Sequence, residues 1–133
     1  MGSNGEPLVV IRGMRGYLEG ERFVLRVGEA MVIGRSRKAD LSTRNAERLH
    51  GRADWKQLIH QPPFNTVSRR HVRIHFLHPG LVEIKDISSN GTFLDGNRID
   101  CVALTDLAEN NHVLAVGAQE RFEIAMLNGR TIN

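Results

Sequence analysis

Apolar residues in this chain recur mostly at every second position, in short segments separated by turn residues. In the segment 71–76, for example, Val72, Ile74 and Phe76 alternate with more polar residues. Such alternation is typical of a β-strand with one buried face. Similar segments or short apolar runs lie at 8–11, 22–27, 31–33, 81–85, 92–95, 98–99, 112–116 and 121–126. Many short strands with turn signals between them predict an all-β sandwich.

Residues 43–66, hereafter the insertion, interrupt this pattern. A stretch of about two dozen residues without a strand signal is longer than most loops of compact domains. The spacing of Trp55, Leu58 and Ile59 predicts one face of a short helix, which the prolines at 62 and 63 would end. The insertion is then either a lid that packs Trp55 on the sandwich edge, or an extension of a binding surface by its basic residues Arg44, Arg48, Arg52 and Lys56.

Length and cysteine content bear on domain organisation and compartment. The 133 residues predict one domain, expected at residues 8–127 between a flexible lead-in (1–7) and a C-terminal tail (128–133). Cys101 is the only cysteine, which suits a reducing compartment. No run approaches the ~18 apolar residues of a membrane helix, and the N-terminus does not resemble a signal peptide. We therefore expect a cytoplasmic protein, alone or within a larger chain, with no membrane contact.

The net charge of +3 is carried mostly by arginine, because lysine occurs only at Lys38, Lys56 and Lys85. The planar guanidinium fork suits the oxygens of carboxylates and phosphates, so the composition indicates an anionic partner without choosing one. Nucleic acid is one such partner. Aromatic residues make up only 5% of the chain, however, and no interleaved aromatic platform for stacking bases is present.

Polar residues concentrate in three stretches next to apolar strands, at 33–36, 67–71 and 86–92. Each stretch is therefore expected in a loop at a strand end, where a rigid scaffold usually carries binding residues. Arg35 supplies a bidentate cation, and Asn90 offers both an amide and a carbonyl that can read a peptide backbone. Together with the hydroxyl groups of serines in the same loops, this set can hold an anion and an extended chain.

These stretches, in this order, resemble the forkhead-associated (FHA) domain family. The residues that carry the resemblance are Gly34-Arg35, Ser68-Arg69-Arg70-His71 and Asn90-Gly91-Thr92. The resemblance covers residues 8–127. It implies an eleven-stranded β-sandwich of the SMAD/FHA type, with the insertion as an added loop or short helix. It also implies a module that binds phosphothreonine peptides from targets of Ser/Thr kinases, without catalysis and without a cofactor.

The resemblance assigns five residues to the phosphopeptide. Arg35 would contact the phosphate directly, with Ser68 as a second ligand. Ser89 would line the pocket beside the phosphothreonine, and Asn90 would hydrogen-bond the peptide backbone that follows it. Arg69 would contact the peptide through its main chain or side chain.

A second group of residues would support the site. His71 is the expected scaffold histidine, whose ring holds the binding loops in place. Asp86 would brace the loop before Asn90, and the remaining supporting residues are Gly34, Gly91 and Thr92. Because the insertion enters the loop that carries Ser68, it can reshape or cover the peptide groove.

The same residues raise several other interpretations. Ser68 and His71 do not form a nucleophile elbow, so a hydrolase is disfavoured. His71 and His75 lie four residues apart on one strand, about 13 Å, which is too far to share a metal. The alternative to phosphopeptide binding is a basic nucleic-acid-binding sandwich or a phospho-independent protein-interaction sandwich. Self-association, with one copy binding a phosphorylated segment of another, also remains open.

Overall fold

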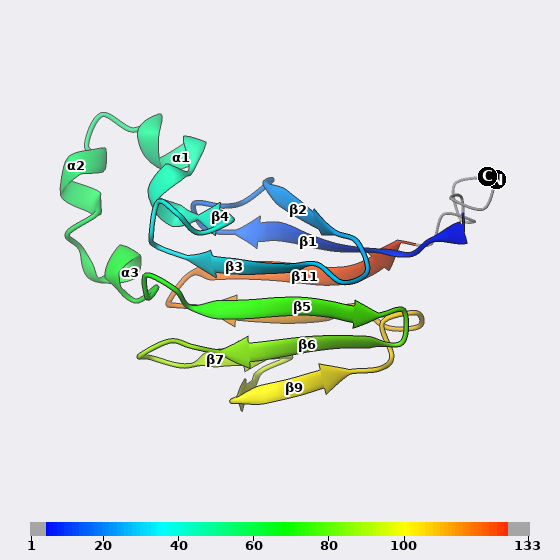
Figure 1. Ribbon diagram of the computed structural model, residues 1–133. Coiled ribbons are helices and arrows are strands. Elements are labelled where there is room, and N and C mark those ends of the chain that lie inside the picture. Colours follow the sequence, from blue (N-terminus) through cyan, green and yellow to red (C-terminus); the bar gives the residue numbers. More distant parts are fainter. Residues whose placement is uncertain (1–4, 128–133) are drawn as a thin grey trace.

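The computed structural model describes residues 5–127, which form two β-sheets stacked face to face (Figure 1). The six-stranded sheet has the order β2-β1-β11-β10-β7-β8, and the five-stranded sheet has the order β4-β3-β5-β6-β9. The strands are β1 Leu8–Arg15, β2 Arg22–Leu25, β3 Ala30–Gly34, β4 Leu41–Ser42, β5 Val72–His78, β6 Leu81–Asp86, β7 Thr92–Leu94, β8 Asn97–Ile99, β9 Cys101–Leu104, β10 His112–Val116 and β11 Glu120–Leu127. The predicted eleven-stranded sandwich is confirmed.

The core lies between the two sheets and is built from the alternating apolar residues. In β5, Val72, Ile74 and Phe76 are fully buried, as the period of two predicts. Ile11 and Phe122 of the other sheet are equally buried and belong to the same apolar cluster. Burying each such side chain contributes about 1.5–3 kcal/mol, so these contacts hold the sheets together and fix the strand ends that carry the loops.

The insertion folds into four short helical segments: the 3₁₀ helix Thr43–Asn45 and the α-helices α1 Glu47–His50, α2 Trp55–Leu58 and α3 Pro62–Asn65. The predicted helix at Trp55 is present and follows Asp54. The expectation that Pro62 and Pro63 end this helix was wrong. They occupy the first turn of α3, where the missing N–H of proline has no helical partner to lose.

The insertion lies at one end of the sandwich, where β3 ends and β5 begins (Figure 1). Buried side chains anchor it there. Leu49 and Phe64 are part of the core, and the Phe64 ring packs edge-on against Tyr17 at 6.0 Å between centroids. Thr66 Oγ1 accepts a hydrogen bond from the backbone N–H of Ala118 at 2.8 Å. Trp55 is only half-buried, so Leu49 and Phe64 anchor the segment more deeply than the tryptophan does.

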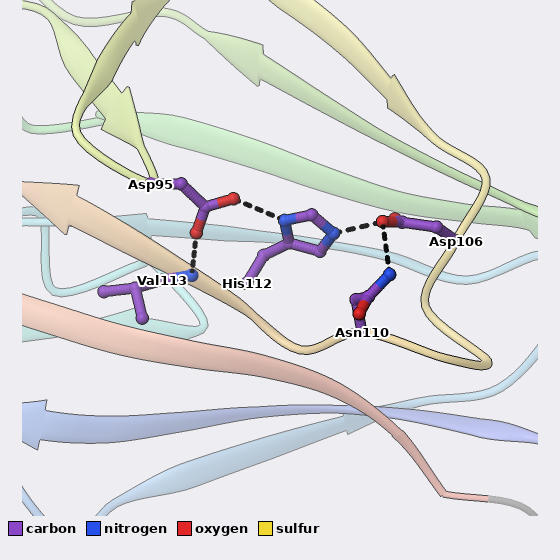
Figure 2. A network of polar contacts seen from close by, with 5 residues as sticks. All are labelled: Asp95, Asp106, Asn110, His112 and Val113. Carbon is purple, nitrogen blue, oxygen red and sulfur yellow. Dashed lines mark hydrogen bonds and ion pairs between the residues drawn. The ribbon is translucent and has the colours of Figure 1, made fainter.

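A polar network in the six-stranded sheet joins the β7–β8 turn to the loop before β10 (Figure 2). His112 Nδ1 lies 2.5 Å from Asp95 Oδ2, and His112 Nε2 lies 2.7 Å from Asp106 Oδ1. Asp95 also accepts a hydrogen bond from the backbone N–H of Val113 at 2.8 Å. Partial burial disfavours the charged ring, but the two carboxylates outweigh it and raise the pKa of His112. Both ring nitrogens face carboxylate oxygens, so the network favours the protonated ring, in which both nitrogens donate.

Two sequence expectations fall on the chain ends. The expected lead-in at 1–7 lies partly outside the described residues, and the expected tail at 128–133 lies wholly outside them. Within residues 5–127, no helix has the length and apolar character needed to cross a membrane.

Candidate functional site

Hydrogen bonds hold the three loops that are predicted to bind the ligand next to one another, at the end of the sandwich that carries the insertion. The backbone N–H of Arg35 donates to the Ser68 carbonyl at 2.9 Å, and that of Ser36 donates to the Arg69 carbonyl at 3.0 Å. The backbone N–H of Ser89 donates to Ser68 Oγ at 3.0 Å. The loop after β3, the loop before β5 and the loop between β6 and β7 therefore form one continuous surface.

His71 lies buried beneath this surface and joins two of the loops through its ring. Nδ1 accepts a hydrogen bond from the backbone N–H of Ser68 at 3.0 Å, and Nε2 lies 2.9 Å from the carbonyl oxygen of Gly91. An accepting Nδ1 leaves Nε2 as the donor, so the ring is neutral. Burial lowers the pKa of His71, against the opposing effect of the Gly91 carbonyl. Protonation would remove the acceptor that Ser68 needs.

Asp86 organises the loop that carries Ser89 and Asn90. Its Oδ1 accepts hydrogen bonds from the backbone N–H and the hydroxyl of Ser88, and from Thr92 Oγ1 at 2.7 Å. Partial burial favours the neutral carboxyl, but these donors outweigh it and lower the pKa of Asp86. The loop is closed by Ser88 Oγ, which accepts from the backbone N–H of Gly91 at 2.8 Å.

Two glycines are required by the geometry of the site. A Cβ added at Gly34 would lie 2.1 Å from the backbone oxygen of Arg69, so only glycine lets these two loops approach. Gly91 has φ +100°, in the region that favours glycine, and an added Cβ would meet the Arg98 guanidinium at 3.0 Å.

Arg35 is the principal cation of the site and has a free guanidinium end. Its Nε donates to the Val67 carbonyl at 2.9 Å, which fixes the direction of the side chain. Within residues 5–127, no carboxylate forms a salt bridge with Arg35, and no hydrogen bond engages its Nη atoms. A guanidinium whose two terminal nitrogens are free can hold two oxygens of one anion.

The other predicted binding residues differ in how freely they can engage a ligand. Ser68 Oγ accepts from Ser89, which leaves the Ser68 hydroxyl hydrogen available as a donor. Ser89 and Arg69 are exposed. Asn90 is exposed too, but its Nδ2 donates to the carbonyl of Thr66 at 3.2 Å, at the end of the insertion. A peptide that uses the Asn90 amide must share or replace this contact.

Sequence reasoning missed part of this surface. Arg37 and Lys38, which follow Arg35 in the same loop, line a hollow together with Arg44 of the insertion. Their basic character next to Arg35 was the only available signal. Of the four basic insertion residues considered from the sequence, only Arg44 lines the hollow. Arg48 pairs with Glu19, Arg52 pairs with Asp54, and Lys56 lies over the Trp55 ring.

Two observations bear on the hydrolase and the metal interpretations. Both ring nitrogens of His71 are engaged by backbone groups, so the ring does not contact the Ser68 hydroxyl as a general base would. The described part of the chain contains no group of three or more His, Cys, Asp or Glu residues arranged to hold a metal ion.

Fold and site together define a class of protein: a β-sandwich whose loops at one end present a guanidinium with free terminal nitrogens. A sequence model of the FHA domain matches residues 31–115, and the chain belongs to this family. A comparison with curated protein sequences finds no significant match.

Solved structures of FHA domains share the fold. The FHA domain of a hypothetical protein of Arabidopsis thaliana has a TM-score of 0.64 at 22% identity, covering 92% of this chain and 88% of that one. The FHA domain of a Chlamydia trachomatis protein has a TM-score of 0.63 at 21% identity, covering 89% and 96%. EmbR of Mycobacterium tuberculosis, solved in complex with a low-affinity phosphopeptide, has a TM-score of 0.57 at 21% identity, covering 89% and 24%.

Proposed function

We propose that this FHA domain binds phosphothreonine-containing peptides of proteins that Ser/Thr kinases phosphorylate, and that it catalyses no reaction. The observation that carries the proposal is the Arg35 guanidinium. It is aimed by its Nε bond to Val67, free at both Nη atoms and set in the same loop surface as the Ser68 hydroxyl. A phosphate offers three strong acceptor oxygens, and a bidentate arginine with a nearby hydroxyl is matched to it.

The remaining residues take roles around that phosphate. Ser89 lines the pocket beside the phosphothreonine, and Arg69 contacts the peptide from the loop before β5. Asn90 reads the peptide backbone after exchanging its contact with Thr66. His71 and Asp86 hold the loops in the geometry that binding needs, so less ordering is required when the ligand arrives.

Family membership and a solved relative support the same function. EmbR, which shares the fold, was solved with a phosphopeptide. The engaged ring of His71 supports a binding role over hydrolysis, because it leaves Ser68 without a base. A nucleic-acid ligand would be held mainly by its backbone charge and would not depend on the phosphorylation of one threonine.

Calorimetric titration with three peptides of one sequence tests the proposal. The peptides carry phosphothreonine, phosphoserine or unmodified threonine at the central position. We expect binding of the phosphothreonine peptide, weaker binding of the phosphoserine peptide by about five-fold for one buried methyl group, and no measurable binding of the unmodified peptide. Equal binding of the phosphorylated and unmodified peptides would overturn the proposal.

A further inference from the structure

A hollow of about 530 Å³ lies beside the proposed phosphothreonine site, between the loop after β3 and the insertion. The loop contributes Arg35, Arg37 and Lys38, and the insertion contributes Arg44 and His60. Ser68, Ser89 and Asn90 do not line it, so the hollow is adjacent to the phosphate ligands and separate from most of them. Arg35 and Arg69 border both regions.

The lining of the hollow is strongly cationic. Its charged residues are Arg35, Arg37, Lys38, Arg44 and Arg69, and no aspartate or glutamate is among its lining residues. Throughout residues 5–127, none of these five side chains forms a salt bridge with a carboxylate. Like charges gathered in a concave surface repel one another and focus a positive potential, which an entering anion relieves.

The insertion wall of the hollow is preformed. The Arg44 guanidinium stacks over the Trp55 ring at 4.8 Å, and Asn45 Nδ2 donates to the Arg37 carbonyl at 2.8 Å. The second contact ties the insertion to the loop that carries Arg37 and Lys38. Phe64, which also lines the hollow, is anchored in the core. A cationic side chain held by stacking loses less freedom on binding than a solvated one.

We propose that this hollow is a second anion-binding subsite, which takes an acidic or phosphorylated side chain of the same peptide whose phosphothreonine Arg35 holds. The inference rests on the proposed function of the neighbouring site. Because Arg35 borders both regions, the second anion lies close in sequence, within about four residues or about 13 Å of extended chain. Once the phosphothreonine is bound, the second group enters the hollow at high effective concentration.

The test uses an alanine-rich peptide with one phosphothreonine, into which one glutamate or one phosphoserine is placed at each position up to about four residues away. Affinities are measured by calorimetry for the wild-type chain and for the double variant Lys38→Gln/Arg44→Gln, which leaves the proposed phosphothreonine ligands intact. The matched control is Arg22→Gln/Arg26→Gln, which removes the same charge from two exposed residues, one in β2 and one directly after it, outside the hollow.

For the wild type, we expect at least one position where glutamate tightens binding about five-fold and phosphoserine about twenty-fold, as charge-assisted contacts predict. The Lys38→Gln/Arg44→Gln variant should lose this gain and still bind the singly phosphorylated peptide within about two-fold of wild type, which also shows that it is folded. The Arg22→Gln/Arg26→Gln control should keep the gain. A larger gain for glutamate than for phosphoserine would assign the subsite to carboxylates.

Two results would overturn the inference, and they are distinguishable. If the phosphothreonine peptide binds but no placement of a second anion tightens binding, or if the gain is equal in both double variants, the subsite is refuted and the proposed function stands. If no phosphothreonine-dependent binding occurs, the proposed function fails and the inference fails with it.

Discussion

The backbone N–H of Ser89 donates a hydrogen bond to the side-chain oxygen of Ser68 across 3.0 Å, joining the loop before β5 to the loop after β6. One hydroxyl thus has two tasks. Its oxygen holds a loop in place, and its hydrogen stays available to a ligand. The site is therefore assembled before any ligand is present, and the proposed phosphate ligand also belongs to the scaffold.

Replacement of Ser68 by alanine removes both tasks. We expect Ser68→Ala to weaken phosphothreonine-peptide binding about 10- to 100-fold, as loss of one hydrogen bond to a charged group predicts. The free energy of unfolding should fall by about 1 kcal/mol, because one intramolecular hydrogen bond is lost. Ser68→Thr keeps the hydroxyl and should retain more of the affinity than Ser68→Ala. Equal affinities of Ser68→Ala and wild type would show that Ser68 is no ligand.

His71→Ala tests the link beneath the loops. The substitution leaves a cavity and strands the Ser68 N–H and the Gly91 carbonyl, so we expect a loss of about 2–4 kcal/mol in urea unfolding. His75→Ala, within β5 and without a hydrogen-bonded side chain in residues 5–127, is the control and should change stability little. An unfolding midpoint of His71→Ala equal to wild type would contradict the scaffold role.

The His112 network gives a pH dependence of definite sign. Partial burial alone would lower the pKa of His112, but its two carboxylate partners together raise it above the ordinary value of 6.5. The stabilisation is therefore complete below pH 6.5 and is lost as the pH rises through the folded-state pKa. We expect the stability difference between wild type and His112→Asn to be larger near neutral pH than in alkaline solution, measured by urea unfolding. A difference that grows toward alkaline pH would contradict the assignment.

The substitution Gly34→Ala tests the close approach of the loop after β3 to the loop before β5. A Cβ at this position would meet the Arg69 backbone oxygen at 2.1 Å, and backbone cannot give way cheaply. We expect Gly34→Ala to lower the free energy of unfolding by about 1–3 kcal/mol and to weaken peptide binding by moving Arg35 away from Ser68. The control is Gly80→Ala, where the added Cβ makes only ordinary contacts at 3.7 Å. Indistinguishable melting temperatures for the two variants would refute this role of Gly34.

The sequence predicted the sandwich because burial of one strand face imposes a period of two that is visible in local sequence. Val72, Ile74 and Phe76 are buried together for this reason. The insertion was harder to predict. Its α-helices have only four residues each, so only the helix at Trp55 was visible as a helical spacing. The prolines at 62 and 63 begin a helix instead of ending one.

The loop residues of the candidate site were predicted from their order in the chain, but their contacts could not be. The bond between Ser68 Oγ and Ser89 and the contact of Asn90 with Thr66 join loops far apart in sequence. The cationic hollow could not be predicted for the same reason, because Arg44 reaches it only through the fold of the insertion. Local patterns carry no record of which loops meet, so these features required the three-dimensional structure.

The most direct measurement of the central claim is a double cycle between the phosphate of the peptide and the guanidinium of Arg35. Calorimetry compares phosphothreonine and threonine peptides on wild type and on Arg35→Ala, with Arg26→Ala as a control at an exposed site. We predict that Arg35→Ala abolishes the preference for the phosphorylated peptide while the protein stays folded, and that Arg26→Ala preserves it. An undiminished preference for phosphothreonine in Arg35→Ala would contradict the account.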